Sequence, residues 1–223
     1  MEVKERIQEK AGELFMRYGV KSITMDEIAS QLGVSKKTIY QYFADKEELV
    51  DSVIEQKLKT SQGECLAGID RSENAVHEEF LMQDRFLEHL SRLNPVALHD
   101  MEKFHPSAYK KFNDHRNTFM REIEEKNLRK GIAQGLYRPE IRVDILSKFR
   151  VDSIYLSLRA DFSGTTFGLA ELQQELFVHY MFGIASLEGN KLIYRYLKER
   201  LTGPVFPVTL PMGSASAVRG PGS

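Results

Sequence analysis

Apolar residues recur at three- and four-residue spacing through most of the chain, and this spacing predicts α-helices. The first apolar stripe consists of Val3, Ile7, Ala11, Leu14, Phe15 and Tyr18. Gly19 follows it and suits a left-handed helix end. Further periodic segments cover about 45–67, 74–93, 109–132, 143–159, 169–187 and 191–201, with breaks at 93–95, 104–107, 134–140 and 162–168. No segment alternates convincingly at a period of two, so the predicted fold is all-α.

Three successive helix starts are predicted between residues 23 and 49. The N-cap residues are Thr24, paired with Glu27 in a capping box, then Ser35, and then Asp45, paired with Glu48. Gly33 suits the left-handed turn that ends the first of these helices. Two short helices joined by a glycine turn and packed on a longer first helix describe a helix-turn-helix unit.

The second short helix, expected over 36–43, has one buried side and one outward side. On a helical wheel Ile39 and Phe43 define the buried side. The residues directed outward are Lys37 and Gln41, flanked by Thr38 and Tyr40. Lys36 and Lys37 at the helix start oppose the helix dipole, and a DNA phosphate would offset that cost. Outward Lys, Gln, Thr and Tyr can read base edges, although the two lysines could also be simply solvated.

The segment "AGELFMRYGVKSITMDEIASQLGVSKKTIYQYFADKEEL" resembles the DNA-binding region of the TetR family of transcriptional regulators. The family hallmark is matched by the run from Thr38 to Phe43 (TIYQYF), followed by "DKE" and Leu49. The resemblance implies that the residues approaching DNA are Thr24, Ser35, Lys36, Lys37, Tyr40, Tyr42 and Lys46. Tyr42 and Lys46 would hold phosphates. Lys37 and Gln41 would contact bases, and for Gln41 that role comes from the helical wheel.

The resemblance also implies two domains, a DNA-binding domain at 1–46 and a helical ligand-binding and dimerisation domain at 47–201. Helices at 143–159 and 169–187 would form a four-helix bundle with a second copy of the chain across a two-fold axis. The residues expected at that interface recur every four positions and are Leu172, Leu176, Tyr180 and Ile184. The same stripe could instead be internal core. The proline- and glycine-rich segment 202–223 is predicted to be a disordered tail.

A set of aromatic and polar residues between these segments suggests a small-molecule site. Its expected members are Phe86, Phe112, His115, Phe119, Phe149, Asp152, Tyr155 and Arg159. They fit an unknown effector that is apolar or aromatic and has one or two polar groups. Aromatic residues at helical spacing also fit an ordinary core. The polar members on one helix face could likewise pair with one another or with Arg116.

Charge and cysteine content narrow the classes of function. The formal net charge of −1 gives no global attraction to nucleic acid or to an anionic membrane, so a DNA site must be local. Cys65 is the single cysteine, which excludes an internal disulfide framework and multi-cysteine metal sites. The histidines show no paired metal spacing, so neither a metal nor another cofactor is expected. A charged N-terminal segment and the lack of long apolar runs predict a cytoplasmic protein without a membrane partner.

The expected function is a sequence-specific DNA-binding regulator, a repressor released by a small molecule. Its partners would be double-stranded DNA with a roughly palindromic operator, a second copy of the chain and the effector. One alternative is an all-α enzyme, but no paired catalytic carboxylates or activated nucleophile stand out in the sequence. The other is a helical protein-interaction module, which would favour an apolar face where this chain places Lys36, Lys37 and Lys46.

Overall fold

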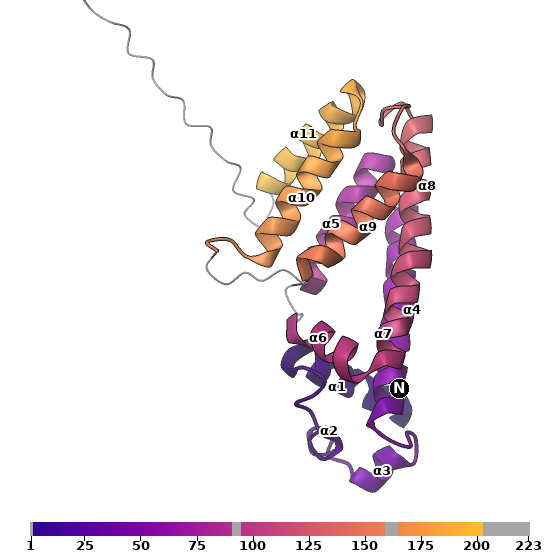
Figure 1. Ribbon diagram of the computed structural model, residues 1–223, viewed down its shortest axis with the longest axis vertical. Coiled ribbons are helices and arrows are strands. Elements are labelled where there is room, and N and C mark those ends of the chain that lie inside the picture. The colour runs from indigo at the N-terminus through magenta and orange to yellow at the C-terminus, as the bar shows by residue number, and fades with distance from the viewer. Residues whose placement is uncertain (1, 91–94, 159–164, 203–223) are drawn as a thin grey trace, which may run out of the picture.

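The computed structural model describes the backbone of residues 2–90, 95–158 and 165–202, and the regular structure of this part consists of helices and one isolated β-bridge (Figure 1). The helices are α1 (Val3–Tyr18), α2 (Met25–Leu32), α3 (Lys36–Tyr40), α4 (Lys46–Asp70), α5 (Ala75–Leu90), α6 (Pro95–Phe104), α7 (Pro106–His115), the π-helical η1 (Arg116–Met120), α8 (Arg121–Ala133), α9 (Val143–Leu158), α10 (Leu169–Ile184) and α11 (Leu187–Thr202). The all-α prediction is confirmed. Of the predicted tail, all but Thr202 lies outside the described residues. No helix of the described ranges combines the length and apolarity needed to cross a bilayer.

The N-terminal helices form a helix-turn-helix unit around a core of fully buried side chains, among them Ile28 and Ile39. Thr24 Oγ1 accepts a hydrogen bond from the Glu27 amide at 3.2 Å, and Glu27 Oε2 accepts one from the Thr24 amide at 2.6 Å. This confirms the predicted capping box. Gly33 has φ 66° and ψ 31°, the predicted left-handed turn. Gly19 has a positive φ of 86°, as expected. Its ψ of 149° lies outside the left-handed helical region, so the predicted left-handed helix end is not found there.

The end of α3 and the presence of α6 differ most from the sequence prediction. The helix expected over 36–43 ends at Tyr40, although Gln41 keeps helical angles and the Phe43 amide still donates to the Ile39 carbonyl at 3.1 Å. The short helix α6 was not predicted at all. Prolines bound it on both sides, and ten residues offer too few helical repeats for the apolar period to stand out.

Helix α4 links the N-terminal unit to the C-terminal helices (Figure 1). Its first turns carry Leu49, Val50 and Val53 into the N-terminal core, which Met101 of α6 and Ala108 of α7 also join. The boundary expected after residue 46 is therefore not a break in packing. The remainder of α4 runs along α5 and α7, away from the tip formed by α2 and α3.

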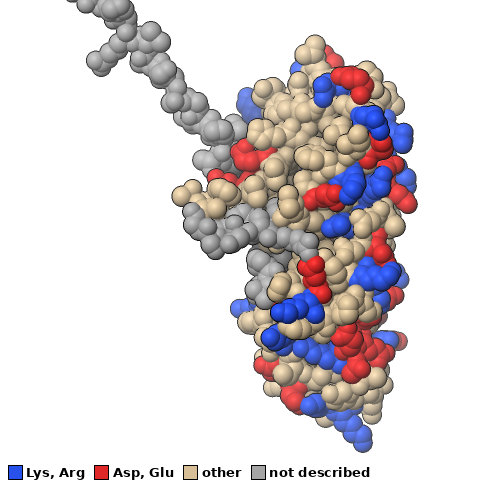
Figure 2. Space-filling model, viewed as in Figure 1, with Lys and Arg blue, Asp and Glu red and all other residues tan. Residues whose placement is uncertain are grey.

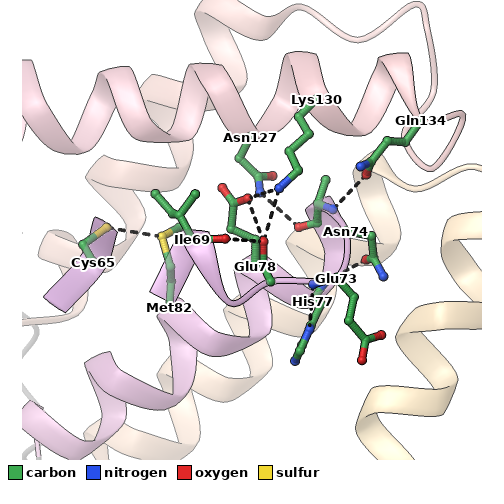
Figure 3. Close-up of polar contacts among 12 residues, drawn as sticks. Cys65, Ile69, Glu73, Asn74, His77, Glu78, Met82, Asn127, Lys130 and Gln134 are labelled. Carbon is green, nitrogen blue, oxygen red and sulfur yellow. Dashed lines mark hydrogen bonds and ion pairs between the residues drawn. The ribbon is translucent and has the colours of Figure 1, made fainter. Parts of the chain in front are cut away.

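The turn after α4 and the start of α5 are fixed to α8 by a polar network (Figure 3), in which Lys130 Nζ donates to Ser72 Oγ at 3.2 Å. Lys130 Nζ lies 2.6 Å from Glu78 Oε2, an ion pair whose carboxylate is buried. Asn127 donates to the Ala75 carbonyl at 3.0 Å, and the Ala75 amide donates to Gln134 Oε1 at 2.9 Å. These bonds satisfy backbone groups that the turn would otherwise leave unpaired. The turn that follows α4 is thus held in place.

The loop after α8 and the turn between α10 and α11 meet through an antiparallel bridge between Tyr137 and Ala185. Tyr137 is 1% exposed, and its ring lies against Gly131 of α8. A Cβ atom at Gly131 would come within 2.0 Å of that ring. The glycine is therefore required by the close approach of the aromatic side chain.

We expect Gly131→Ala to lower the free energy of unfolding by about 1–3 kcal/mol or more, because Tyr137 must move out of a close-packed core. Urea unfolding followed by circular dichroism measures this change. The matched control is Gly63→Ala in α4, where a Cβ meets nothing within 4 Å. That variant should gain up to about 1 kcal/mol of helix propensity. Equal stability of the two variants would contradict the assigned packing.

Candidate nucleic-acid interface and C-terminal site

The tip of the molecule is formed by α2 and α3 (Figure 1), and both basic and acidic side chains lie there (Figure 2). Lys37, Tyr40, Gln41 and Tyr42 are all exposed, Tyr40 by 44% and Tyr42 by 39%. Within the described part of the chain, none of these four side chains forms a hydrogen bond or ion pair. Ile39 and Phe43 are buried beneath them, as the helical wheel predicts. The outward face of α3 is therefore free to contact another molecule.

Lys36 has a partner within the chain. Its Nζ lies 2.7 Å from Asp26 Oδ2 on α2, and this hydrogen bond raises the pKa of Lys36. The carboxylate compensates part of the unfavourable interaction between a lysine and the helix start. Both side chains are exposed, so DNA could replace the carboxylate as the partner of Lys36.

Lys46 points toward the N-terminal core. Its Nζ donates to the Val20 carbonyl at 2.6 Å and lies 6.0 Å from the centre of the Phe15 ring. Partial burial lowers its pKa, since desolvation penalises the charged form. A phosphate contact would require Lys46 to give up the Val20 carbonyl, so the predicted role of Lys46 stays a prediction.

The hydroxyl-bearing residues of the predicted interface act first as helix caps. The Thr24 hydroxyl is held in its capping box. Ser35 Oγ accepts from the Thr38 amide at 3.1 Å and lies 2.8 Å from Thr38 Oγ1. These bonds fix the starts of α2 and α3, and the predicted contacts of Thr24, Ser35 and Thr38 with DNA stay a prediction.

Residues 7–53 match the family model described as "Bacterial regulatory proteins, tetR family". The chain is also 24% identical over 193 residues to the HTH-type transcriptional repressor KstR2 of Mycolicibacterium smegmatis, covering 84% of this chain and 93% of the relative. The chain belongs to the TetR family. As a TetR-family protein it is a DNA-binding transcriptional regulator. A second relative, regulator SAB2452 of Staphylococcus aureus, is 27% identical over 71% of this chain and 78% of its own length.

Solved structures share the fold of this TetR-family chain. KstR2 of Mycobacterium tuberculosis aligns with a TM-score of 0.58 at 22% identity, over 83% of this chain and 96% of that one. A regulator from Saccharomonospora viridis in complex with choline aligns with a TM-score of 0.67 at 19% identity, over 82% of this chain and 97% of that one. FadR of Bacillus subtilis in complex with stearoyl-CoA aligns with a TM-score of 0.60 at 18% identity, over 81% of this chain and 98% of that one. At these identities the likeness shows the fold alone.

Part of the predicted ligand set comes together in this regulator where α7, η1 and α9 meet. The rings of Phe112 and Tyr155 lie edge to face, 5.2 Å apart, and those of His115 and Phe119 stack at 5.2 Å. The guanidinium of Arg116 lies 5.3 Å from the centre of the Tyr155 ring. The predicted residues Phe112 and Tyr155 thus form one cluster with Arg116, although α7 and α9 are distant in the sequence, and the predicted pair His115 and Phe119 lies on the same α7–η1 segment.

The remaining predicted ligand residues lie elsewhere. Phe149 is 54% exposed on α9, and Asp152 pairs with Lys148 at 2.5 Å on the same exposed side. Phe86 is half-buried on α5, and Arg159 lies outside the described residues. A groove of about 580 Å³ on α4 and α5 and another of about 500 Å³ beside α4 and α7 contain none of the predicted ligand residues. The expected cavity stays a prediction.

The four residues of the predicted dimer stripe on α10 differ in their exposure to solvent. In the single chain Tyr180 is 5% exposed and Ile184 is 1% exposed, and both belong to the C-terminal core. The expectation that these two residues contact a partner copy stays a prediction, and their burial within the protomer leaves them almost no surface for such a contact. Leu172 and Leu176 stay partly exposed. A four-residue period marks one face of a helix but does not say whether that face packs inside the protomer or against another one.

A buried charged cluster in the C-terminal core was missed by the sequence analysis. Arg150 Nε lies 3.8 Å from Glu79 Oε2, and the two side chains are 3% and 0% exposed. The Tyr180 hydroxyl donates to Glu124 Oε1 at 2.7 Å, and Arg150 donates to Gln83 Oε1 at 3.0 Å. Burial, followed by mutual repulsion with Glu124, raises the pKa of Glu79 well above its usual value. The available signal was the position of Glu79 within the apolar stripe of α5.

Proposed function

We propose that the chain acts as a homodimer that binds a roughly palindromic operator through the exposed face of α3 and releases it when an effector binds. The observation that carries the proposal is the exposed surface of α3 and the two residues after it, where Lys37, Tyr40, Gln41 and Tyr42 have no hydrogen-bond or ion-pair partner among the described residues and lie within the family's DNA-binding segment. Lysine and glutamine suit base edges in the major groove, and tyrosine hydroxyls suit phosphates.

We expect Lys37→Ala and Gln41→Ala to reduce discrimination between the operator and unrelated DNA. A good base contact is worth about 1–3 kcal/mol. Fluorescence anisotropy with the chain's own upstream region and a scrambled duplex measures both affinities. Lys59→Ala on α4 is the matched control, because it removes an exposed lysine far from the tip. Unchanged discrimination in both α3 variants would rule out this face as the reading surface.

The proposed dimer face is the outer side of α9 together with α10. Ile145, Phe149 and Leu156 are 53%, 54% and 71% exposed. Their spacing of four and seven residues places them within about 40° on one helix face. Partly exposed Leu172 and Leu176 extend this apolar surface onto α10. Such a surface on two adjacent helices fits a four-helix bundle made with the same surface of a second copy.

The effector is proposed to bind among the C-terminal helices. The choline and stearoyl-CoA complexes named above are complexes of proteins that share this fold. Release from DNA follows from linkage, since a ligand shifts the protein toward a DNA-incompetent state only by binding that state more tightly. A tenfold loss of operator affinity requires about 1.4 kcal/mol of such preference.

A further inference from the structure

The geometry points to Arg116 as the anchor of a negatively charged group on the effector. We infer that the effector is an apolar molecule bearing a carboxylate, bound where α7, η1 and α9 meet. This inference rests on the proposed function, because it assumes that an effector binds the C-terminal helices.

Arg116 is a partly buried cation without an acidic partner. In the described ranges no carboxylate lies within 4.0 Å of its guanidinium, and its Nε is buried without a hydrogen-bond acceptor. Neighbouring basic residues differ, since Lys110 pairs with Asp114 at 2.5 Å and Arg121 with Glu125 at 3.2 Å. Removing a guanidinium from water without a partner is unfavourable. A bound carboxylate would restore charge-assisted hydrogen bonds to it.

His115 directly precedes Arg116 in the chain and contacts α4. Its Nδ1 lies 3.2 Å from the Gln62 side-chain amide, and with the amide nitrogen as donor the ring proton resides on Nε2. Burial lowers the pKa of His115, which keeps the ring neutral at neutral pH. Nε2–H then donates and does not accept. The Arg116 guanidinium donates and cannot accept, and an ionised carboxylate accepts and cannot donate, so the two groups are complementary.

The surroundings of Arg116 are aromatic. Phe112, Phe119 and Tyr155 are half-buried around the guanidinium and the imidazole, and they can contact the apolar body of a ligand. The chain is π-helical from Arg116 to Met120, between α7 and α8. The wider π turn changes the direction of side chains relative to an α-helix, and such turns recur at functional sites.

The position of this cluster also connects it to the DNA-binding unit. Gln62, the partner of His115, lies on α4, whose first turns pack in the N-terminal core. The opposite end of α4 leads into the turn where Lys130 of α8 contacts Ser72 and Glu78. About 24 Å of helix separate Gln62 from the start of α4, at 1.5 Å per residue. A ligand that engages His115 acts on a helix that is held at one end and carries the DNA-binding unit at the other.

Stacking on Tyr155 alone could also hold Arg116 in place, and ligand chemistry separates the two accounts. The test uses the full chain with two matched pairs of probes, decanoate with decan-1-ol and 2-naphthoate with 2-naphthol. Calorimetry gives their affinities and anisotropy gives the release of operator DNA. We expect at least one carboxylate to bind tenfold or more tightly than its neutral counterpart and to release DNA.

Arg116→Met should abolish this preference for the carboxylate, and Arg116→Lys should keep part of it. Arg129→Met is the control, because it removes an exposed arginine that pairs with Glu125 on α8. The inference is overturned if no carboxylate binds more tightly than its neutral counterpart, or if folded Arg116→Met keeps the preference. Release of DNA by a neutral probe would then leave the proposed function standing, and the Lys37 and Gln41 variants test DNA binding independently.

Discussion

Arg150→Met should destabilise the protein by about 3–5 kcal/mol at pH 7, because it leaves the buried glutamates without their cation. Arg150 and Glu79 are 3% and 0% exposed, and Glu124 beside them is 3% exposed. Methionine fills most of the volume of arginine, so the loss of stability comes from removing the charge and not from opening a cavity. Urea unfolding measures it. Glu79→Gln, which removes the charge and keeps the shape, should cost far less.

The penalty for Arg150→Met should also depend on pH. Burial raises the pKa of Glu79 in the folded state above its value of about 4.5 in the unfolded chain. The folded state therefore retains a proton that the unfolded state releases. The contribution of Glu79 to the free energy of unfolding is therefore greatest below pH 4.5 and declines as pH rises toward its folded pKa. Without Arg150 this decline should be steeper and should reach higher pH.

The groups that face Glu79 are Glu124, Arg150, Glu78 with its partner Lys130, and the hydroxyls of Tyr137 and Tyr180. Comparison of unfolding at pH 5 and pH 8 isolates the effect of Glu79. Adding Glu79→Gln to Arg150→Met should remove most of the difference between the two pH values. If Arg150→Met lowers the free energy of unfolding equally at the two pH values, the buried carboxylates are not the cause of the loss.

Leu156→Glu should convert the proposed dimer into a folded monomer. Leu156 is 71% exposed in the single chain, so the protomer loses little packing when the side chain changes. In the dimer the new carboxylate would be buried against an apolar surface. That costs roughly 2–4 kcal/mol, which raises the dimer dissociation constant about 30- to 1000-fold. Sedimentation velocity at low micromolar concentration measures the assembly state, and thermal unfolding confirms the fold.

Two variants make the dimer result specific. Leu66→Glu changes a leucine on α4 that is 48% exposed, and it should leave the dimer unchanged. Ile184→Glu places a charge at a residue that is 1% exposed, and it should unfold the protomer itself. If Leu156→Glu remains a dimer, the α9–α10 surface is not the interface. Leu187 and Tyr194 on α11, 82% and 66% exposed, would then be the apolar surface to test.

The sequence by itself determined the features that depend on near neighbours along the chain. The Thr24–Glu27 capping box, the Ser35 cap and the Gly33 turn all form between residues three or four positions apart, so spacing is enough to predict them. The helical period likewise placed most of the long helices within a few residues of their observed bounds. The outward face of α3 followed from the same period, because Ile39 had to be buried.

Only the tertiary structure decided which distant residues meet. A helical period gives the direction of Tyr180 and Ile184 but not the surface they pack against, which is the core of their own protomer. Arg150 and Glu79 are 71 positions apart, and no local rule pairs them across α9 and α5. The contact of Lys46 with the Val20 carbonyl and the meeting of Arg116 with Tyr155 have the same origin. Such pairs depend on how whole helices pack, and the energy that fixes helix packing is the burial of many side chains at once.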